Sequence, residues 1–412
     1  MRSRLELVAE TAEEYRKASK KDKGKMLDNL TKLTGYNRDY VCHLLNLCRG
    51  KTMFTRQGDR VIRARADFKL RRRRNRKKTY GPEVLQALKT IWAIMDMPCV
   101  KRLVPCMEWL VPRLEQVGEL SVTPEVRQKL LSMSASTVDR LLSQERRKLA
   151  GKGRSLTKPG TLLKHQIPIR TFAQWDDARP GFTEMDLVDH GGGNTKGQYV
   201  FSLTVTDIAT GWTEMRAVKN KAQKWVFEAL KLIVTRLPFP LLGIDSDNDS
   251  AFINNHLRRF CEANKVTFTR IRPGRKNDNC YVEQKNWSVI RRNAGYARYE
   301  SDKELELLNR MYDLLRLYQN FFQPSMKLES KERDGAKVTR RYDQAMTPYH
   351  RVLASDYVEE SVKAGLTQVF NTLNPAELKR QITRLQELLQ EESARPKSLA
   401  GDVAVAQSAS FT

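Results

Sequence analysis

Between residues 182 and 322, strand-like and helix-like patterns follow one another in an order that restricts the possible folds. Three strand patterns come first, over 182–189, 198–206 and 212–218, where apolar and polar residues alternate. Further helix and strand patterns follow over 219–237, 241–246, 250–264, 266–271, 279–292 and 303–322. Because strands and helices are interleaved, we expect an α/β domain in which helices cover one mixed five-stranded sheet.

Three acidic residues lie on these elements where a metal site would need them. Asp186 is within the first strand, Asp247 directly follows the fourth, and Glu283 is on the helix after the fifth. Between Asp247 and Glu283 there are 283 − 247 − 1 = 35 residues. Two hard cations held by carboxylates roughly 3.5–4 Å apart can activate an attacking oxygen and stabilise a leaving oxygen. The pattern therefore favours metal-dependent phosphodiester chemistry.

Other acidic residues nearby compete for the same role. Asp245 shares a strand face with Asp247, because side chains alternate along a strand, and it stays open as an alternative ligand. Asp189 lies on the opposite face from Asp186 in a regular strand, and Asp207, before Ile-Ala-Thr-Gly, fits a turn. Spacing and flanking residues favour Asp247 as the second ligand.

Over roughly residues 175–325 the chain resembles the catalytic core of DDE transposases and retroviral-type integrases, in particular that of bacterial insertion-sequence transposases. The order of the elements is that of an RNase H-like fold. The matching motifs are Asp186 with the paired strands after it, Ser246-Asp247-Asn248 ahead of Phe252, and Asn277-Asp278-Asn279 leading into Glu283. The sequence departs from the family at Asp249, where glycine is common, and at Ile290, where a basic residue is frequent.

The resemblance implies an activity and a cofactor. Asp186, Asp247 and Glu283 would be the catalytic residues and would hold two Mg²⁺ ions, for which Mn²⁺ can substitute. Water would cleave a transposon end, and the freed 3′-OH would then attack target DNA. The partners would be double-stranded transposon ends and target DNA. Joining two ends suggests at least a homodimer, and the family points to the cytoplasm and nucleoid of a bacterium.

The charge balance agrees with a nucleic-acid partner. Lys and Arg number 74 against 48 Asp and Glu, a formal net charge of +26. Basic residues that neutralise phosphates release counterions, which favours binding to a polyanion. From Arg60 to Lys78, eleven basic residues stand against Asp67 alone, and this predicts a flexible arm on DNA. No apolar run is long enough to span a membrane, so we expect no membrane partner.

Two helical regions precede the α/β region. In the first, Gly35 separates two helical patterns within 25–47, as in a helix-turn-helix, although a plain helical hairpin would show the same pattern. In the second, a small-residue turn at Ser134-Ala135-Ser136 is followed by a helix with Arg140 on its outer side. We expect both regions to bind DNA, and the second is the better helix-turn-helix candidate.

These patterns predict seven segments. They are a helical domain (1–55), a basic arm (56–79), a second helical DNA-binding domain (80–150), a linker (151–174), the catalytic core (175–325), a small basic C-terminal domain (326–395) and a disordered tail (396–412).

A set of basic residues is expected to contact DNA phosphates, either in the arm, on the second helical domain or beside the metal site. They are Arg71, Arg72, Arg73, Arg74, Arg140, Arg272, Arg275, Lys276, Lys285 and Arg291. Trp287 is one turn after Glu283 and fits a core position better than a base-stacking position. His190 and His256 fit packing or solvent-exposed roles, because two-metal chemistry needs no histidine base.

Two other functions compete with transposition. A metal-dependent nuclease that cuts without joining would share the carboxylates but would not need upstream end-recognition domains. A DNA-binding regulator without catalysis would not need Asp186, Asp247 and Glu283. The carboxylates and the helical regions together favour the transposase.

Overall fold

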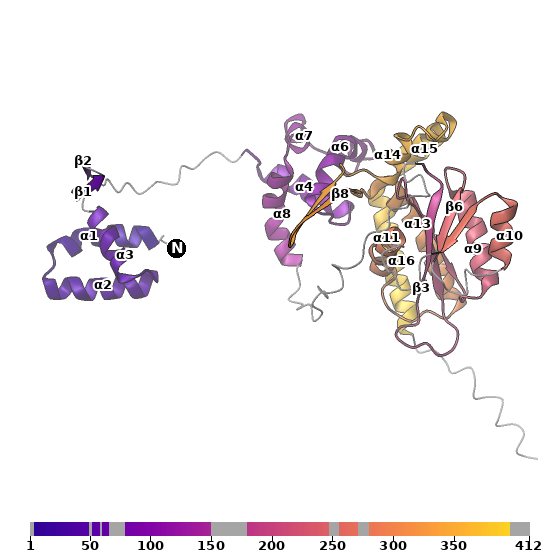
Figure 1. The fold of residues 1–412 in the computed structure, drawn as a ribbon, viewed down its shortest axis with the longest axis horizontal. Coiled ribbons are helices and arrows are strands. Elements are labelled where there is room, and N and C mark those ends of the chain that lie inside the picture. Colours follow the sequence, from indigo (N-terminus) through magenta and orange to yellow (C-terminus); the bar gives the residue numbers. More distant parts are fainter. Residues whose placement is uncertain are drawn as a thin grey trace, which may run out of the picture. The chain divides into compact units, whose positions relative to one another are not determined.

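The computed structural model describes residues 4–48, 52–57, 60–65, 79–149, 179–246, 255–270 and 280–395. The chain divides into two compact units, Met1–Thr79 and Tyr80–Thr412, and each is described by itself. Figure 1 shows the helices of the first unit in indigo and the elements of the second from purple to yellow. In the described part of the chain, no helix has the length and apolarity that crossing a bilayer requires.

The first unit is built on three helices, α1 (Arg4–Lys17), α2 (Lys20–Thr34) and α3 (Arg38–Cys48). The turn between α2 and α3 is made where Gly35 adopts a left-handed conformation with φ 68°, which ends α2. The Asn37 side chain then accepts the N–H of Asp39 at the start of α3. The predicted break at Gly35 is therefore confirmed. Of the leucines on α2, Leu27 and Leu30 are buried, while Leu33 is 69% exposed.

Part of the predicted basic arm is a β-hairpin. Strands β1 (Thr52–Gln57) and β2 (Arg60–Arg65) pair antiparallel, with Thr52 opposite Arg65 and Gln57 opposite Arg60. For these residues, the prediction of a flexible arm is wrong. It rested on the density of basic residues and left out Val61 and Ile62, whose β-branched side chains favour a strand. The rest of the basic run, 66–78, lies outside the described residues.

The second unit begins with a helical region. Its helices are α4 (Pro82–Ile94), α5 (Val100–Leu103), α6 (Met107–Gln116), α7 (Pro124–Leu131) and α8 (Ala135–Leu149). The apolar side chains of Leu88, Ile91 and Trp92 on α4 are buried, and so is Met95 directly after it. A short turn joins α7 to α8, and the Ser134 hydroxyl accepts the N–H of Thr137 at 3.3 Å, as a cap does.

A five-stranded sheet forms the centre of the unit. Its strands are β3 (Phe182–Asp189), β4 (Phe201–Asp207), β5 (Thr213–Val218), β6 (Gly243–Ser246) and β7 (Thr267–Arg270), in the order β5-β4-β3-β6-β7. The first three strands pair antiparallel, whereas β3–β6 and β6–β7 are parallel. The observed order and the mixed pairing confirm the predicted RNase H-like sheet.

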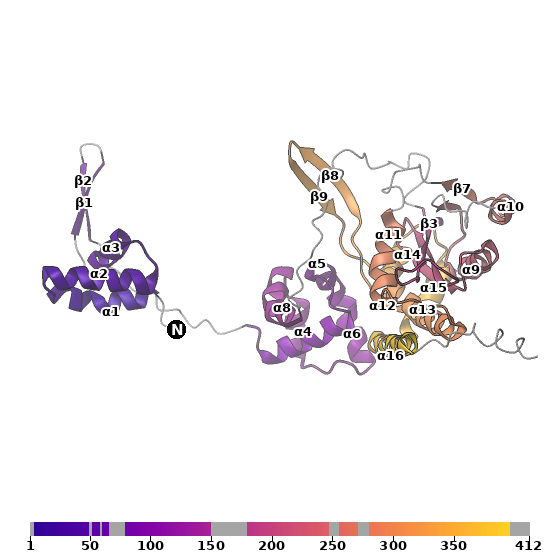
Figure 2. The same ribbon diagram turned by 90° about the horizontal axis from the view of Figure 1, so that it is seen from below.

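The two faces of the sheet differ in character. One face presents Met185, Leu203, Val205 and Ile244 to α9 (Gln223–Arg236) and α10 (Asn255–Ala263), and this side is an apolar core. The other face carries polar residues in the middle of the sheet and is covered by α11 (Cys280–Lys285), the helical segment Asn286–Arg291 that continues it into α12 (Arg292–Ala294), and α13 (Asp302–Phe322). Figures 1 and 2 show α9 and α10 on one side of the strands and α11 and α13 on the other.

The chain after α13 forms a second hairpin and three helices. Strands β8 (Leu328–Asp334) and β9 (Lys337–Tyr342) precede α14 (Pro348–Leu353), α15 (Glu360–Thr372) and α16 (Pro375–Ala394). The region predicted as a small basic C-terminal domain therefore contains a paired ribbon and helices, of which α16 is the longest.

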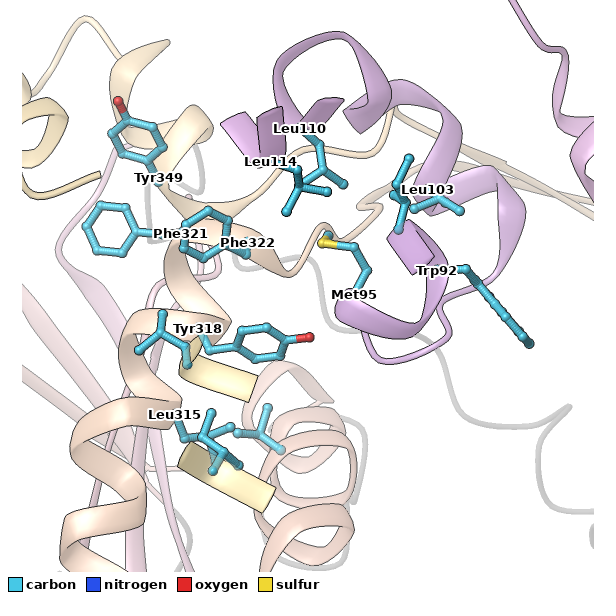
Figure 3. Packing of buried hydrophobic residues seen from close by; sticks show 14 of the residues in the cluster. Trp92, Met95, Leu103, Leu110, Leu114, Leu315, Tyr318, Phe321, Phe322 and Tyr349 are labelled. Carbon is cyan, nitrogen blue, oxygen red and sulfur yellow. The ribbon is translucent and has the colours of Figure 1, made fainter. Parts of the chain in front are cut away.

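One apolar core joins the helical region to the C-terminal helices. Figure 3 shows Met95, which directly follows α4, and two leucines of α6 beside two aromatic residues of α13. The leucines are Leu110 and Leu114, and the aromatic residues are Tyr318 and Phe322. The Tyr318 hydroxyl donates to the carbonyl of Ile94 at 2.6 Å, and Gln323 donates to that of Met95 at 3.0 Å. The structure therefore groups 80–149 and 326–395 with the sheet, where we had predicted separate domains. The buried apolar side chains of the two regions pack against one another in a single core.

Candidate active site

The polar face of the sheet is built by strand alternation along β3. Glu184 and Asp186 point to the same side, opposite to Met185. The register places Glu184 beside Asp245 of β6 and Asp186 beside Thr204 of β4. Glu184, Asp245 and Thr204 are fully buried, and Asp186 is half-buried at the edge of the helix that covers this face.

Asp186 is held by the helix that crosses it. Its Oδ2 accepts a hydrogen bond from the side-chain Nδ2 of Asn286 at 2.7 Å, and its Oδ1 accepts the N–H of Leu187 at 2.8 Å. Asn286 lies three residues after Glu283, and residues three apart share a helix face. The structure thus brings Asp186 into contact with the helical stretch that begins with Glu283 and its neighbours.

Glu283 lies in the first turn of α11, and its side chain is exposed. From Asn286 to Arg291 the helix widens into a π-helical segment, a form that is frequent at functional sites. Val282, Val289 and Ile290 are buried on the inner side. Glu283 is therefore on the outer side of the helix, at the rim of the polar face.

Glu184 fixes the start of this helix. Its Oε2 accepts the backbone N–H of Val282 at 2.9 Å, across 98 positions in the sequence. Val282 is in the first turn of α11, where N–H groups have no partner within the helix. A buried carboxylate is a strong acceptor for such a group. Glu184 therefore anchors the backbone next to Glu283, and the sequence analysis did not identify it.

Asp245 is held within the sheet. It is fully buried, and its Oδ1 accepts the hydroxyl of Thr269 on β7 at 2.8 Å. Asp247 lies outside the described residues, immediately after Ser246, which is the last residue of β6. Asp247 as second ligand, with Asp245 as the alternative, stays a prediction.

The remaining acidic residues of this region have other partners. Asp207 is fully buried at the end of β4, where its carboxylate accepts the N–H groups of Gly181 and Thr210 at 2.8 and 2.7 Å. Burial raises the pKa of Asp207 to about 6. This confirms its predicted role in a turn. Asp189 is exposed and pairs with Arg291 at 3.4 Å.

The donor set of the polar face suits a hard cation. Asn286 Oδ1 and Thr204 Oγ1 are buried, and neither has a hydrogen-bond partner within the described residues. Both adjoin Asp186, through the hydrogen bond of Asn286 and the strand register of Thr204. A magnesium ion takes oxygen ligands and keeps waters, which can donate to such acceptors. Within the described ranges no three His, Cys, Asp or Glu residues form a group that could hold a metal.

Lys285 departs from its predicted place on the surface. It is 8% exposed, and its pKa is lowered to about 7, mainly by burial and further by the charges of Arg102 and Arg351. It is buried on the inner side of α11, whereas Glu283, two residues earlier, is exposed. A phosphate in solution cannot reach a side chain buried in this way.

The other predicted DNA contacts fall into two groups. Arg140 is exposed on α8, where its guanidinium donates to Ser136 and Thr137 one turn earlier. Arg291 closes the π-helical segment, with its guanidinium 5.0 Å from the ring centroid of the exposed Tyr296. The others lie outside the described residues: Arg71, Arg72, Arg73, Arg74, Arg272, Arg275 and Lys276.

Trp287 is on the surface, and the expected core position is wrong. Its side chain is 66% exposed. It lies four residues after Glu283, on the same outer side of the helix. The signal that could have shown this is the spacing of Val282, Val289 and Ile290, which already fill the inner face.

The two histidines are placed as predicted. His190 is fully buried, and its Nε2 shares a hydrogen bond of 2.8 Å with the hydroxyl of Ser202, which contacts the Tyr312 hydroxyl at 2.7 Å. Burial, and secondarily the charge of Arg291, lowers the pKa of His190 to about 3. His256 is exposed and packs on the ring of Phe227.

Comparison with known proteins identifies the domain around this site. Residues 176–276 match the family model described as the integrase core domain. Two catalytic cores of retroviral integrases, from BIV and HTLV-2, are among the similar solved structures, at 19% and 16% identity and TM-scores of 0.30 and 0.28. They cover 43% and 36% of this chain and 96% and 93% of their own.

A relative that matches nearly the whole chain is the uncharacterized protein y4rM of Sinorhizobium fredii. The two sequences are 39% identical over 351 residues, which is 85% of this chain and 95% of the relative. The sheet order, the carboxylates on its polar face and the family match agree with one another. The chain therefore belongs to the same family as y4rM and carries an integrase core domain of RNase H-like fold within the DDE transposase and integrase group.

Proposed function

We propose that this protein is a DNA transposase, which cleaves the ends of a transposable element and joins the freed 3′-OH to target DNA. The observation that carries the proposal is the hydrogen bond between Asp186 and Asn286. Asp186 of the central strand is bonded there to a residue three positions after Glu283, and β6 ends at Ser246, the residue before Asp247 in the sequence, which supports the proposal.

The catalytic residues in this proposal are Asp186, Asp247 and Glu283, and they would hold two Mg²⁺ ions, with Mn²⁺ as a substitute. When bound, such ions activate an attacking oxygen and stabilise the leaving oxygen of the phosphodiester. Asn286 orients Asp186 through its amide N–H, and its amide oxygen can accept a hydrogen from a water in the site. Glu184 fixes the backbone beside Glu283.

The exposed side of the Glu283 helix would face the DNA. Trp287 offers a flat apolar surface four residues after Glu283, and unpaired bases stack on such surfaces. Arg291 stands at the end of the same segment and suits a backbone phosphate. DNA ends fray at the last pairs, so a transposon end brought to the carboxylates would present a base to Trp287.

The helices that precede the core would recognise the element's ends. The short turn between α7 and α8 and the exposed Arg140 support a helix-turn-helix role for α8. The unit of α1 to α3, with the basic residues Arg71 to Arg74 after it in sequence, would add a second contact. We also propose that the protein acts as at least a dimer on two DNA ends, in the nucleoid of a bacterial cell.

The test is a strand-transfer assay with Mg²⁺, using the terminal sequences found in the DNA that flanks the gene. Wild type is compared with Asp247→Asn and Glu283→Gln, which remove a charge with little change in shape. We expect joined products from wild type and at least a 100-fold loss in both variants, while DNA binding in a gel-shift assay stays within about threefold.

The other outcomes separate the competing functions. Cleavage without joining would replace the transposase with a nuclease. Activity that survives Asp247→Asn but is lost in Asp245→Asn would move the second ligand to Asp245. Binding without any chemistry, with Mn²⁺ as well as Mg²⁺, would leave a DNA-binding regulator.

A further inference from the structure

The hairpin of β8 and β9 is a feature that the proposed site does not use. Figure 2 shows its two strands extending away from the sheet, and both views show them running toward the side of the unit that carries α4 to α8. With seven residues at about 3.4 Å each, β8 spans roughly 24 Å. Apart from Val338, the residues of β9 are exposed.

The base of the hairpin is fixed to the body of the protein. Ser325 and Met346 pair as an isolated bridge, and the Lys327 ammonium donates to the carbonyl of Ala209 at 2.9 Å. The Asp343 carboxylate accepts the N–H of Lys327 at 2.6 Å and pairs with Arg351 of α14 at 2.6 Å. A ribbon anchored in this way projects in a defined direction.

The two faces of the hairpin carry different charges. Residues that pair in an antiparallel ladder share a face, and the face alternates along each strand. Arg333 pairs with Val338, and Arg340 and Tyr342 follow on the same face of β9. The opposite face holds two acidic and two basic residues: Glu332, Asp334, Lys337 and Arg341. The first face is therefore basic where its side chains are described, and the second is neutral.

The side chains described on the basic face are exposed, apart from that of Val338. Arg333 and Arg340 are exposed, and Tyr342 is 49% exposed on the same side. The guanidinium of Arg333 is oriented by a hydrogen bond to the carbonyl of Gly335 in the turn. Arginines on a projecting ribbon present N–H donors that match phosphate oxygens. A two-stranded ribbon also fits the major groove of DNA.

The hairpin base is tied to the helix that follows it. Arg351 of α14 pairs with Asp343 at the hairpin base and donates to the carbonyl of Ser325 at 3.0 Å. The ribbon is therefore held to the same compact unit that carries Glu283.

We propose that the hairpin β8–β9 binds duplex DNA through its Arg333 and Arg340 face, with both arginines on backbone phosphates. This rests on the proposed function in so far as DNA is the substrate, and it adds a contact outside the catalytic core and the upstream helices. The partner is the DNA flanking the reacting end, because the ribbon extends away from the carboxylates. The neutral face is turned away from the duplex.

The chain offers a matched control for this proposal. Arg340 and Arg341 are neighbours in β9 that are both exposed but lie on opposite faces. One double variant carries Arg333→Gln and Arg340→Gln, and the control carries Lys337→Gln and Arg341→Gln. Each double variant removes two positive charges from the same hairpin. A difference in DNA affinity between them therefore comes from the face on which the charges lie and not from the loss of charge alone.

The experiment measures the affinity of the full chain for a fluorescent 40-base-pair duplex of the terminal sequence, by anisotropy over a series of salt concentrations. Binding weakens as salt rises, and each phosphate contact adds about 0.9 to the steepness of log K plotted against log salt concentration. Losing two contacts should therefore make this plot less steep by about 2. We expect Arg333→Gln with Arg340→Gln to bind at least 10-fold more weakly near 150 mM salt, and the control within about threefold of wild type.

Several results would overturn the proposal. Equal losses in both double variants would show a diffuse charge effect, and unchanged binding in both would remove the hairpin from the DNA interface. Unchanged DNA affinity together with a changed oligomeric state by mass photometry would assign the basic face to a second copy of the chain. The strand-transfer assay of wild type stays separate: a wild type that binds DNA without joining it would end the transposase proposal, and the binding comparison would still decide the hairpin.

Discussion

The carboxylate of Glu184, in the middle of the central strand, accepts the backbone N–H of Val282 at 2.9 Å, one residue before Glu283. A buried strand residue thereby fixes the first turn of α11, the helix that carries the proposed ligand Glu283. Replacing Glu184 by Leu removes the acceptor and leaves a buried N–H without a partner, which costs about 1–3 kcal/mol.

We therefore expect Glu184→Leu to slow strand transfer at least 10-fold and to raise the Mg²⁺ concentration at half-maximal rate. Glu184→Gln keeps an acceptor oxygen and should recover most of the rate. A magnesium titration of the strand-transfer rate checks both variants. Equal loss in Leu and Gln variants, with an unchanged magnesium requirement, would mean that the carboxylate only supports the fold.

Asn286 should matter through its contact with Asp186. In Asn286→Ala, the Nδ2 donor 2.7 Å from Asp186 Oδ2 is lost, so the carboxylate can rotate. We expect a strand-transfer rate reduced about 10-fold to 100-fold, with a loss of DNA affinity smaller than threefold, as for a residue that orients a ligand. Asn293→Ala, at an Asn two turns further along the same helical stretch, is the control and should stay within about threefold.

Trp287 should contribute to binding of a DNA end and little to stability. Because its ring is 66% exposed, Trp287→Ala should change the free energy of unfolding by less than about 0.5 kcal/mol. Loss of a base stack of about 1–3 kcal/mol should weaken binding of a frayed end roughly 5-fold to 100-fold. Trp225→Ala, at a 40% exposed tryptophan on α9 across the sheet, is the matched control. An equal effect of the two variants on end binding would argue against stacking at Trp287.

His190 makes the protein less stable in acid. Its pKa in the folded protein is about 3, against an ordinary value of 6.5, because it is buried and near Arg291. As the pH falls below 6.5, the unfolded chain gains a proton that the folded chain does not, so stability decreases toward pH 3. Within this window the loss approaches about 1.4 kcal/mol per pH unit.

Thermal unfolding of wild type and His190→Asn at pH 7, 6 and 5 tests this dependence. The amide does not titrate, so the variant should be the less stable protein at pH 7, and the gap should narrow as the pH falls. The groups around the ring are Ser202, Tyr299, Asp189 and Arg291. A gap that is constant from pH 7 to pH 5 would contradict the assignment.

Arg113 connects the upstream helices to the C-terminal helices. It is 5% exposed, and its Nη2 donates to the carbonyls of Asn371 and Leu373 at 2.8 and 2.6 Å. Arg113→Met leaves both carbonyls without this donor and should lower the free energy of unfolding by about 2–4 kcal/mol. Arg127→Met, which breaks an exposed pair with Glu115, should cost less than about 1 kcal/mol. Calorimetry of the two variants against wild type gives the comparison.

The sequence predicted the strands that carry a periodic apolar pattern. The limits of β3, Phe182 and Asp189, agree with the pattern, and so does the position of Asp186 within it. The hairpin β8–β9 was not predicted, because a ribbon exposed on both faces buries no apolar stripe and shows only mixed charge. Hydrophobic periodicity reports burial, and a projecting element has little of it.

The site was predictable only in part for a similar reason. Asp247 and Glu283 have a spacing that can be recognised in the sequence. Glu184 instead contacts a backbone N–H, and no residue type in the sequence reveals such a contact. Nothing in the sequence marks Asn286, because its contact with Asp186 exists only when the helix lies across β3. Lys285 was predicted to contact DNA at the surface because it is positively charged. Only the fold shows that its side chain is buried.

The wide helical turn from Asn286 to Arg291 holds one more residue per hydrogen-bonded ring than an α-helix does. Because each residue of a wide turn contributes less rotation than an α-helical residue, these six residues cover about the same rotation as five residues of an α-helix. Deleting one of them would restore an α-helix and leave Glu283 facing about the same way relative to α12. Relatives that keep Glu283 can therefore lose one residue between Glu283 and Asn293, and we expect a gap there to be a single residue long.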